Sequence, residues 1–167
     1  MRLNIVLVEP EIPANTGNIS RTCSVIGASL HLVHPLGFDI SEKAVKRAGL
    51  DYWDELDLHE YQSFAEVKEK YPHGSFYYCT TKAPRAYSRV SFPLGDQDEI
   101  FLVFGKETRG LPEELLKDNI ESCIRIPMKE NKRSLNLSNS VAVVAYEVLR
   151  QNDFKNLQEE GRIREYD

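Results

Sequence analysis

Residues 133–149, RSLNLSNSVAVVAYEVL, join a polar segment to the start of an apolar helix. Five small hydrogen-bonding side chains occur within seven residues: Ser134, Asn136, Ser138, Asn139 and Ser140. A helix N-terminus needs only one or two such residues, so the others require a further role. From Val141 onward the helix is apolar nearly all round, which predicts burial on more than one side. In a chain of this size, a second subunit is a reasonable second neighbour.

Short apolar runs alternate with helical segments along the rest of the chain. Strands are expected at residues 3–8, 30–34, 75–81, 99–105 and 123–127. Helices are expected at residues 15–26, 41–47, 63–71, 112–117 and 138–151, with Asn15 or Thr16 as cap of the first and Gly27 as its end. Apolar strands that alternate with helices indicate an α/β fold, in which helices cover both faces of a mostly parallel sheet.

The length of 167 residues is typical of one domain, so we expect a single domain over residues 1–167, with a polar tail at 152–167. No apolar run is long enough to span a membrane, and residues 1–10 lack the plan of a signal peptide, which favours the cytoplasm. The three cysteines are expected in the core of a protein from a reducing compartment. No cysteine or histidine spacing predicts a metal site, and His31 and His34 are expected to be structural.

The net charge of −5 argues against a protein that coats nucleic acid through bulk electrostatics. Basic residues still gather in three clusters: Lys46 and Arg47; Lys82, Arg85 and Arg89; and Lys129, Lys132 and Arg133. Taken alone, each cluster is more often a solvated surface than a binding site.

Ligands of open parallel sheets bind where strands end and helices begin, and three such junctions here are rich in polar residues. In the first, EPEIPANTGNISR (9–21), Asn15, Asn18 and Arg21 recur every three residues, which would place them near one helix face. This pattern suits either an ordinary cap with a surface arginine or a polar face for a hydroxylated or phosphorylated substrate. The third junction is the segment from Ile124 to Ser140.

The second junction, FGKETRGLP (104–112), is only superficially like a phosphate-binding P-loop. Ile100 occupies the position of the first P-loop glycine, and Glu107 follows Lys106 where Ser or Thr is required. No G-x-G-x-x-G occurs either, so we exclude nucleotide triphosphate hydrolysis. Two glycines around Lys-Glu-Thr-Arg favour a tight turn where the backbone approaches a ligand, or simply a loop with positive φ angles.

Together, three segments resemble the signature motifs of the SpoU group in the SPOUT methyltransferase superfamily. They are N-x-G-N-x-x-R (15–21), FGKETRGLP (104–112) and IRIPMKENKRSLNLSNSVAVVAYE (124–147). Over residues 3–151, the chain is most similar to the minimal tRNA (cytidine/uridine-34-2′-O)-methyltransferase family. Lys106 departs from relatives that often carry proline at that position.

The resemblance implies a C-terminal trefoil knot, a homodimer with its active sites near the subunit interface, and no metal. It implies S-adenosylmethionine as cofactor, with S-adenosylhomocysteine as product. The residues implied in cofactor binding are Cys79, Thr80, Gly105, Glu107, Gly110, Ile126, Met128, Ser134, Leu135 and Asn139.

The implied reaction is attack of a ribose 2′-oxygen on the sulfonium methyl group, at the wobble nucleotide (C34 or a modified U34) of leucine tRNAs. Arg21 would stabilise the developing oxyanion; it is an awkward base, because guanidinium groups keep their proton to above about pH 12. The other catalytic candidates would orient the substrate and Arg21: Asn15, Asn18, Glu107, Ser138 and Asn139. The RNA-binding candidates flank them: Lys82, Arg85, Arg89, Lys129, Lys132 and Arg133.

Three alternatives stay open at this point. A ribosomal RNA 2′-O-methyltransferase of the same group would keep the chemistry and change the RNA. A non-catalytic regulator that binds the cofactor and RNA would be expected to have lost Asn15, Arg21 or Glu107. A small-molecule α/β enzyme would leave the basic clusters without a purpose.

Overall fold

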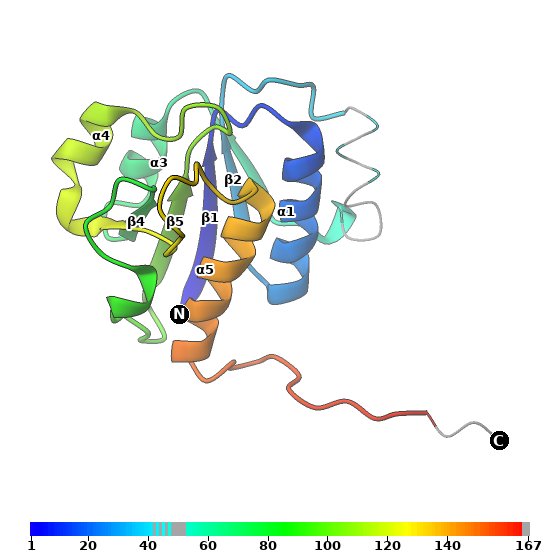
Figure 1. Ribbon diagram of the computed structural model, residues 1–167. Helices are drawn as coiled ribbons and strands as arrows, with labels where there is room; N and C mark the ends of the chain where they lie inside the picture. Colours follow the sequence, from blue (N-terminus) through cyan, green and yellow to red (C-terminus); the bar gives the residue numbers. More distant parts are fainter. Residues whose placement is uncertain (42, 44, 46, 48–52, 165–167) are drawn as a thin grey trace.

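The computed structural model describes residues 1–41, 43, 45, 47 and 53–164, and its centre is a six-stranded parallel sheet (Figure 1). The strands are β1 (Arg2–Val8), β2 (Ser29–Val33), β3 (Leu58–Tyr61), β4 (Ser75–Cys79), β5 (Glu99–Phe104) and β6 (Cys123–Ile124). Their order is β3-β2-β1-β5-β4-β6, and each pair of neighbours is parallel. The predicted α/β class with a parallel sheet is confirmed.

Helices cover both faces of this sheet (Figure 1). Helices α1 (Pro13–Ile26) and α5 (Leu137–Gln151) lie side by side on one face. Helices α3 (Phe64–Lys70) and α4 (Glu113–Asp118) pack on the other. Short 3₁₀ helices, η1 (Trp53–Glu55), η2 (Tyr87–Arg89) and η3 (Ile120–Ser122), lie in the connections.

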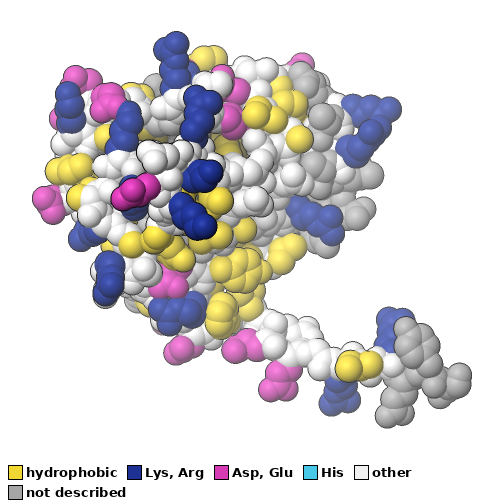
Figure 2. Space-filling model, in the orientation of Figure 1, with side chains coloured by type: hydrophobic (Ala, Val, Ile, Leu, Met, Phe, Trp, Pro, Cys, Tyr) yellow, Lys and Arg dark blue, Asp and Glu magenta, His cyan; other side chains and the backbone are white. Residues whose placement is uncertain are grey.

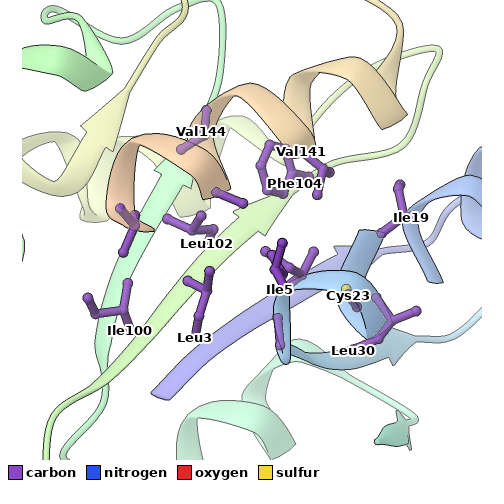
Figure 3. Packing of buried hydrophobic residues seen from close by; sticks show 14 of the residues in the cluster. Leu3, Ile5, Ile19, Cys23, Leu30, Ile100, Leu102, Phe104, Val141 and Val144 are labelled. Carbon is purple, nitrogen blue, oxygen red and sulfur yellow. The ribbon is translucent and has the colours of Figure 1, made fainter. Parts of the chain in front are cut away.

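Successive side chains of the central strands enter two different cores. Leu3, Ile5 and Leu7 of β1 join the core under α1 and α5 together with residues of β5 (Figure 3). Val6 and Val8 enter the core under α3 and α4. Both faces of the sheet are covered at its centre, so the central strands β1 and β5 are largely apolar. This is why these strands can be recognised in the sequence.

Most observed boundaries lie within one residue of the expected ones, and the larger differences concern α1, β3, β4 and β6. Helix α1 begins two residues earlier than expected, and its N-cap is Ile12, not Asn15 or Thr16. Gly27 ends it in the left-handed conformation, as predicted. Strand β6 is only two residues long, and the expected strand at 75–81 ends at Cys79. Strand β3 was not expected, because LHEY at the sheet edge mixes polar with apolar residues.

The helix expected at 41–47 falls in part on residues 42, 44 and 46, which lie outside the described residues, as does Lys46 of the first basic cluster. Cys23 and Cys123 are buried and Cys79 is partly buried, and all three thiols are free. Within the described residues, no helix is both long and apolar enough to cross a lipid bilayer.

A buried polar cluster surrounds His31 of β2, which is fully inaccessible to solvent. Its Nε2 lies 2.9 Å from Asn4 Oδ1, and its Nδ1 lies 2.9 Å from the Tyr61 hydroxyl. Because Asn4 Nδ2 donates to the Ile100 carbonyl, Asn4 Oδ1 accepts, and His31 Nε2 carries the proton. The His59 ring stacks on His31 with the ring centroids 4.9 Å apart. These contacts suit the structural role expected of His31.

Stability should therefore decline in mild acid. Burial, followed by the charge of His59, lowers the pKa of His31 from 6.5 to about 3. Folding thus favours neutral His31; its contribution is complete above pH 6.5 and is lost as the pH falls toward 3. From this group, urea unfolding should show a loss of about 2 kcal/mol between pH 7 and pH 5.

The variant His31→Gln should show a shallower pH dependence of the unfolding free energy, whatever its stability at pH 7. The control is His73→Gln, which removes a histidine on an exposed turn outside this cluster. Equal slopes in wild type and His31→Gln would refute the assignment.

Candidate active site

The three polar segments converge at the carboxyl edge of the sheet. Strands β1 and β5 are neighbours, with Leu7 paired with Phe104, so the loops that follow them lie side by side. The first polar turn of α5 reaches the same place, because Asn136 contacts Asn15 at the start of α1. Segments distant in sequence thus form one site, at the edge where parallel sheets bind ligands.

The Glu107 carboxylate connects the second segment to the first. Its Oε2 accepts the backbone N–H of Glu11 at 2.7 Å. Its Oε1 accepts the N–H of Ile12 at 3.2 Å and Nδ2 of Asn15 at 3.4 Å. Ile12, the N-cap of α1, provides no side-chain cap, so Glu107 acts at this helix N-terminus from another part of the chain.

Asn15 connects Glu107 to the third segment through a second hydrogen bond. Since its amide nitrogen donates to Glu107, its Oδ1 accepts from Asn136 Nδ2 at 3.1 Å. The Oδ1 of Asn136 in turn accepts from the Ser138 and Asn139 backbone amides at 2.9 and 3.4 Å, as the N-cap of α5. These groups form one chain of hydrogen bonds with fixed donors and acceptors, made of one carboxylate, two amide side chains and a helix N-terminus.

Asn136 also accounts for much of the polar run before α5. The Ser138 hydroxyl donates to Asn136 Oδ1 at 2.6 Å, and the Ser140 hydroxyl donates to the Asn136 carbonyl at 3.1 Å. Asn136 was not among the predicted site residues. Its position directly before the apolar run, with small polar residues two and three positions later, is the cap signature that would have identified it.

The two glycines of the second segment allow its loop to close. A Cβ on Gly105 would lie 2.1 Å from the carbonyl carbon of Gly110, closer than any side chain allows. Gly110 has φ +69°, and its N–H donates to the Lys106 carbonyl at 2.8 Å. The predicted tight turn is present, and backbone packing within the loop itself requires Gly105.

The structure separates the three polar residues of α1 that were expected on one face. Asn15 is buried, whereas Asn18 and Arg21 are exposed to solvent. Both ends of the Asn15 amide bind protein groups, so this residue holds the site together from inside. Asn18 and Arg21 lie where an external substrate can reach them.

A cavity of about 480 Å³ opens beside the third segment. It is lined by Thr81, Arg125, Pro127, Met128, Lys129, Glu130, Asn131, Lys132 and Arg133. Four of these side chains are cationic and one is anionic, so the pocket favours anionic groups. Its volume lies within the range of roughly 300–1,000 Å³ typical of small-molecule sites. It includes Met128 of the predicted cofactor set and Lys129, Lys132 and Arg133 of the predicted RNA-binding set.

The other predicted cofactor residues lie on the neighbouring strand ends and loops. Cys79 ends β4, and Thr80 donates its N–H to the Ile124 carbonyl at 3.0 Å. Burial raises the pKa of the Cys79 thiol, which makes it a poor nucleophile at neutral pH. Ile126 is half-buried, and Ser134 and Leu135 are exposed near the start of α5.

The second basic cluster lies between β4 and β5, and two of its members contact the protein itself. Lys82 forms an ion pair with Glu113 at the start of α4. The Arg85 guanidinium donates to the carbonyl of Glu121. Arg89 ends η2 and is exposed. Lys82 would have to exchange its ion pair for a phosphate contact in order to bind RNA.

Comparison with known proteins adds three findings. The SpoU rRNA Methylase family matches residues 2–146. A tRNA (cytidine(34)-2′-O)-methyltransferase of Photorhabdus asymbiotica is 51% identical over 157 residues, which cover 89% of this chain and 93% of that protein. A solved structure described as giving insights into 2-OH methylation of C/U34 on tRNA is 41% identical, with a TM-score of 0.85, and the match covers 92% of this chain and 98% of that one.

A more distant structure shares the fold. It is the SpoU methyltransferase AviRb of Streptomyces viridochromogenes in complex with the cofactor AdoMet, 21% identical with a TM-score of 0.78. The match covers 91% of this chain and 58% of that one.

Replacement of Glu107 by glutamine should be costly although the two side chains have the same shape. Three N–H groups point at the carboxylate, so in either orientation the glutamine NH₂ would face a donor. The free energy of unfolding should fall by about 1–3 kcal/mol in urea titrations. The control is Glu113→Gln, whose exposed ion pair with Lys82 is worth at most about 1 kcal/mol. Equal effects of the two variants would contradict the central place given to Glu107.

Proposed function

The chain belongs to the SpoU rRNA methylase family, and we propose that it methylates the ribose 2′-hydroxyl of nucleotide 34, the wobble position, in tRNA. The observation that carries this proposal is the hydrogen-bonded assembly of the three motif segments around Glu107. The relative from Photorhabdus asymbiotica, named for this reaction, supports the choice of substrate, as does the solved structure concerned with C/U34. Leucine tRNAs are the substrates that we expect.

S-adenosylmethionine is the proposed cofactor, and when bound it supplies an electrophilic methyl group. The residues present fit such a molecule. The cavity beside Met128 has adequate volume, and the partly exposed Ile126 and Leu135 offer apolar surface to an adenine ring. The closed 105–110 loop presents its backbone at the same edge. The neighbouring complex that contains AdoMet has the same fold.

In this proposal the side chains of the site divide into two groups. Glu107, Asn15 and Ser138 hold the site in shape, because their polar atoms bind other protein groups. Arg21 and Asn18 face the substrate, and Arg21 stabilises the negative charge that develops on the 2′-oxygen. The rate gain comes from the aligned position of the hydroxyl and from this electrostatic contact.

The proposed RNA surface surrounds the cavity. Figure 2 shows lysine and arginine side chains gathered above the hydrophobic ones on the face occupied by α5. Lys129, Lys132 and Arg133 line the cavity, and Lys82, Arg85 and Arg89 extend the surface. Contacts of this kind attract the phosphate backbone of the anticodon stem-loop despite the net charge of −5.

We further propose that residues 1–167 form one domain, that the C-terminal part is a trefoil knot and that the protein acts in the cytoplasm, where tRNA is modified. Backbone hydrogen bonds support the knot. They join residues 80–87 to Ile124 and Arg125, just before the chain crosses to α5. Residues 152–157 turn back, with Phe154 and Leu157 packed against the core, and residues 158–164 then leave the body as a tail (Figure 1).

A homodimer is proposed from the outer surface of α1 and α5. Val143 and Tyr146 of α5 and Val25 of α1 are large apolar side chains exposed by 38%, 44% and 51%. Figure 2 shows hydrophobic side chains gathered over α5. A second copy that covers them would bury apolar surface close to the active site.

Transfer of labelled methyl from S-adenosylmethionine to unmodified tRNA tests the proposed reaction. Wild type should label the ribose of nucleotide 34, and Arg21→Ala should be slower by about a hundredfold, because the developing oxyanion loses its cation. Arg150→Ala, which also changes an exposed helix arginine, should behave as wild type. Label at another nucleotide or in ribosomal RNA would overturn the substrate. Cofactor binding without transfer to any RNA would favour a non-catalytic regulator.

Sedimentation of Val143→Asp and Tyr146→Asp tests the homodimer. Wild type should sediment as a dimer, and both variants as monomers, because a buried unpaired carboxylate opposes association. Ile120→Asp, at an equally exposed apolar side chain on η3, should stay dimeric. A monomeric wild type would refute this part of the proposal.

A further inference from the structure

The loops that follow β1 and β5 stay in register after the strands have ended. Leu7 pairs with Phe104 in the sheet. Two residues later, Lys106 Nζ lies 3.8 Å from Glu9 Oε1. Two residues later again, Glu11 contacts Thr108, with the same separation of 97 residues. Side-chain contacts thus continue the strand pairing into the site.

The Glu11–Thr108 contact has specific geometry. A single carboxylate oxygen, Oε1 of Glu11, accepts the backbone N–H of Thr108 at 3.0 Å and its hydroxyl at 2.7 Å. These two hydrogen bonds, the hydroxyl first, lower the pKa of Glu11, so the residue is charged at neutral pH. An amide oxygen at the same position can accept both bonds, although more weakly than a carboxylate oxygen.

The backbone of Glu11 is supported from behind by the loop after β2. The Gly37 N–H donates to the Pro10 carbonyl at 2.9 Å. A Cβ on Gly37 would lie 2.7 Å from the Glu11 Cα, so no larger residue fits between the loops. The loop after β2 therefore fixes the Glu11 backbone independently of the contact with Thr108.

Two carboxylates cross between the loops in opposite directions. Glu107 of the second loop accepts backbone N–H groups of the first, and Glu11 of the first accepts from the second. Two such connections resist sliding and rotation better than one. Glu107 was predicted from the motif, whereas Glu11 was not.

We propose that Glu11 is a positioning residue for methyl transfer, an inference that rests on the function proposed above. Through Thr108 it holds the 105–110 loop, with its proposed cofactor contacts Gly105 and Gly110, in fixed relation to the helix that carries Arg21. Glu11 touches neither cofactor nor RNA in this assignment. It aligns the methyl group with the attacking oxygen.

The test combines Glu11→Ala, Glu11→Gln, Thr108→Val and the double variant Glu11→Ala/Thr108→Val. The control is Glu66→Ala on α3, whose carboxylate also accepts a loop N–H, from Gln62 at 2.9 Å. The measurements are kcat and KM for tRNA, the Kd of S-adenosylmethionine, the melting temperature and the exchange rate of the Thr108 amide proton.

Glu11→Ala should lower kcat about tenfold, because misalignment acts on the chemical step. The cofactor Kd should change by less than about threefold, and the melting temperature should match that of Glu66→Ala. Glu11→Gln should restore kcat, since its oxygen accepts both bonds. The double variant should be no slower than Glu11→Ala, because both changes remove one contact.

Several results would overturn the assignment in an active enzyme. They are a kcat of Glu11→Ala equal to that of Glu66→Ala, parallel losses of kcat, cofactor affinity and stability, multiplicative effects in the double variant, and no rescue by Glu11→Gln. If wild type methylates no RNA, the proposed function fails separately, and amide exchange decides. Protection of the Thr108 N–H that is lost in Glu11→Ala and kept in Glu11→Gln supports the contact, and an unprotected N–H in wild type refutes it.

Discussion

The hydrogen bonds accepted by Glu107 are the constraint on which the rest of the site depends. Three N–H groups from the start of α1 and the loop before it converge on one carboxylate at the end of β5. The backbone donors of a helix N-terminus need acceptors, and the N-cap residue of α1, Ile12, makes no side-chain cap hydrogen bond. Because the N–H groups at that terminus bind the Glu107 carboxylate, two segments that lie more than 90 residues apart are joined.

The Glu107 carboxylate also fixes the donor and acceptor roles of the amide side chains beyond it. Glu107 can only accept, so Asn15 must donate to it and must accept from Asn136, which leaves the Asn136 oxygen to cap α5. Each amide orientation follows from the one before. The polar residues of the motifs thus form hydrogen bonds mainly with one another. In the proposed function, contact with substrate falls to exposed residues such as Arg21 and to the basic side chains around the cavity.

Much of the fold was predictable from local pattern. The apolar strands β1, β2, β4 and β5, the end of α1 at Gly27 and the buried helix α5 were all expected. The failures have different causes. Strand β3 owes its conformation to pairing with β2. Helix α1 begins at Pro13, a residue suited to the first helical position, and a carboxylate from another segment supports this N-terminus. Such long-range partners leave no local mark in the chain.

The α/β class, the three polar segments with their order, and the apolar face of α5 could be predicted from the sequence, because they depend on side chains within one turn or one strand. The folded structure was needed to establish that Asn15 faces inward, that Asn136 bonds to Asn15 across 121 residues of sequence, and that Glu11 pairs with Thr108. These pairings follow from the order and register of β1 and β5. Register is a property of two strands together, and neither sequence segment contains it alone.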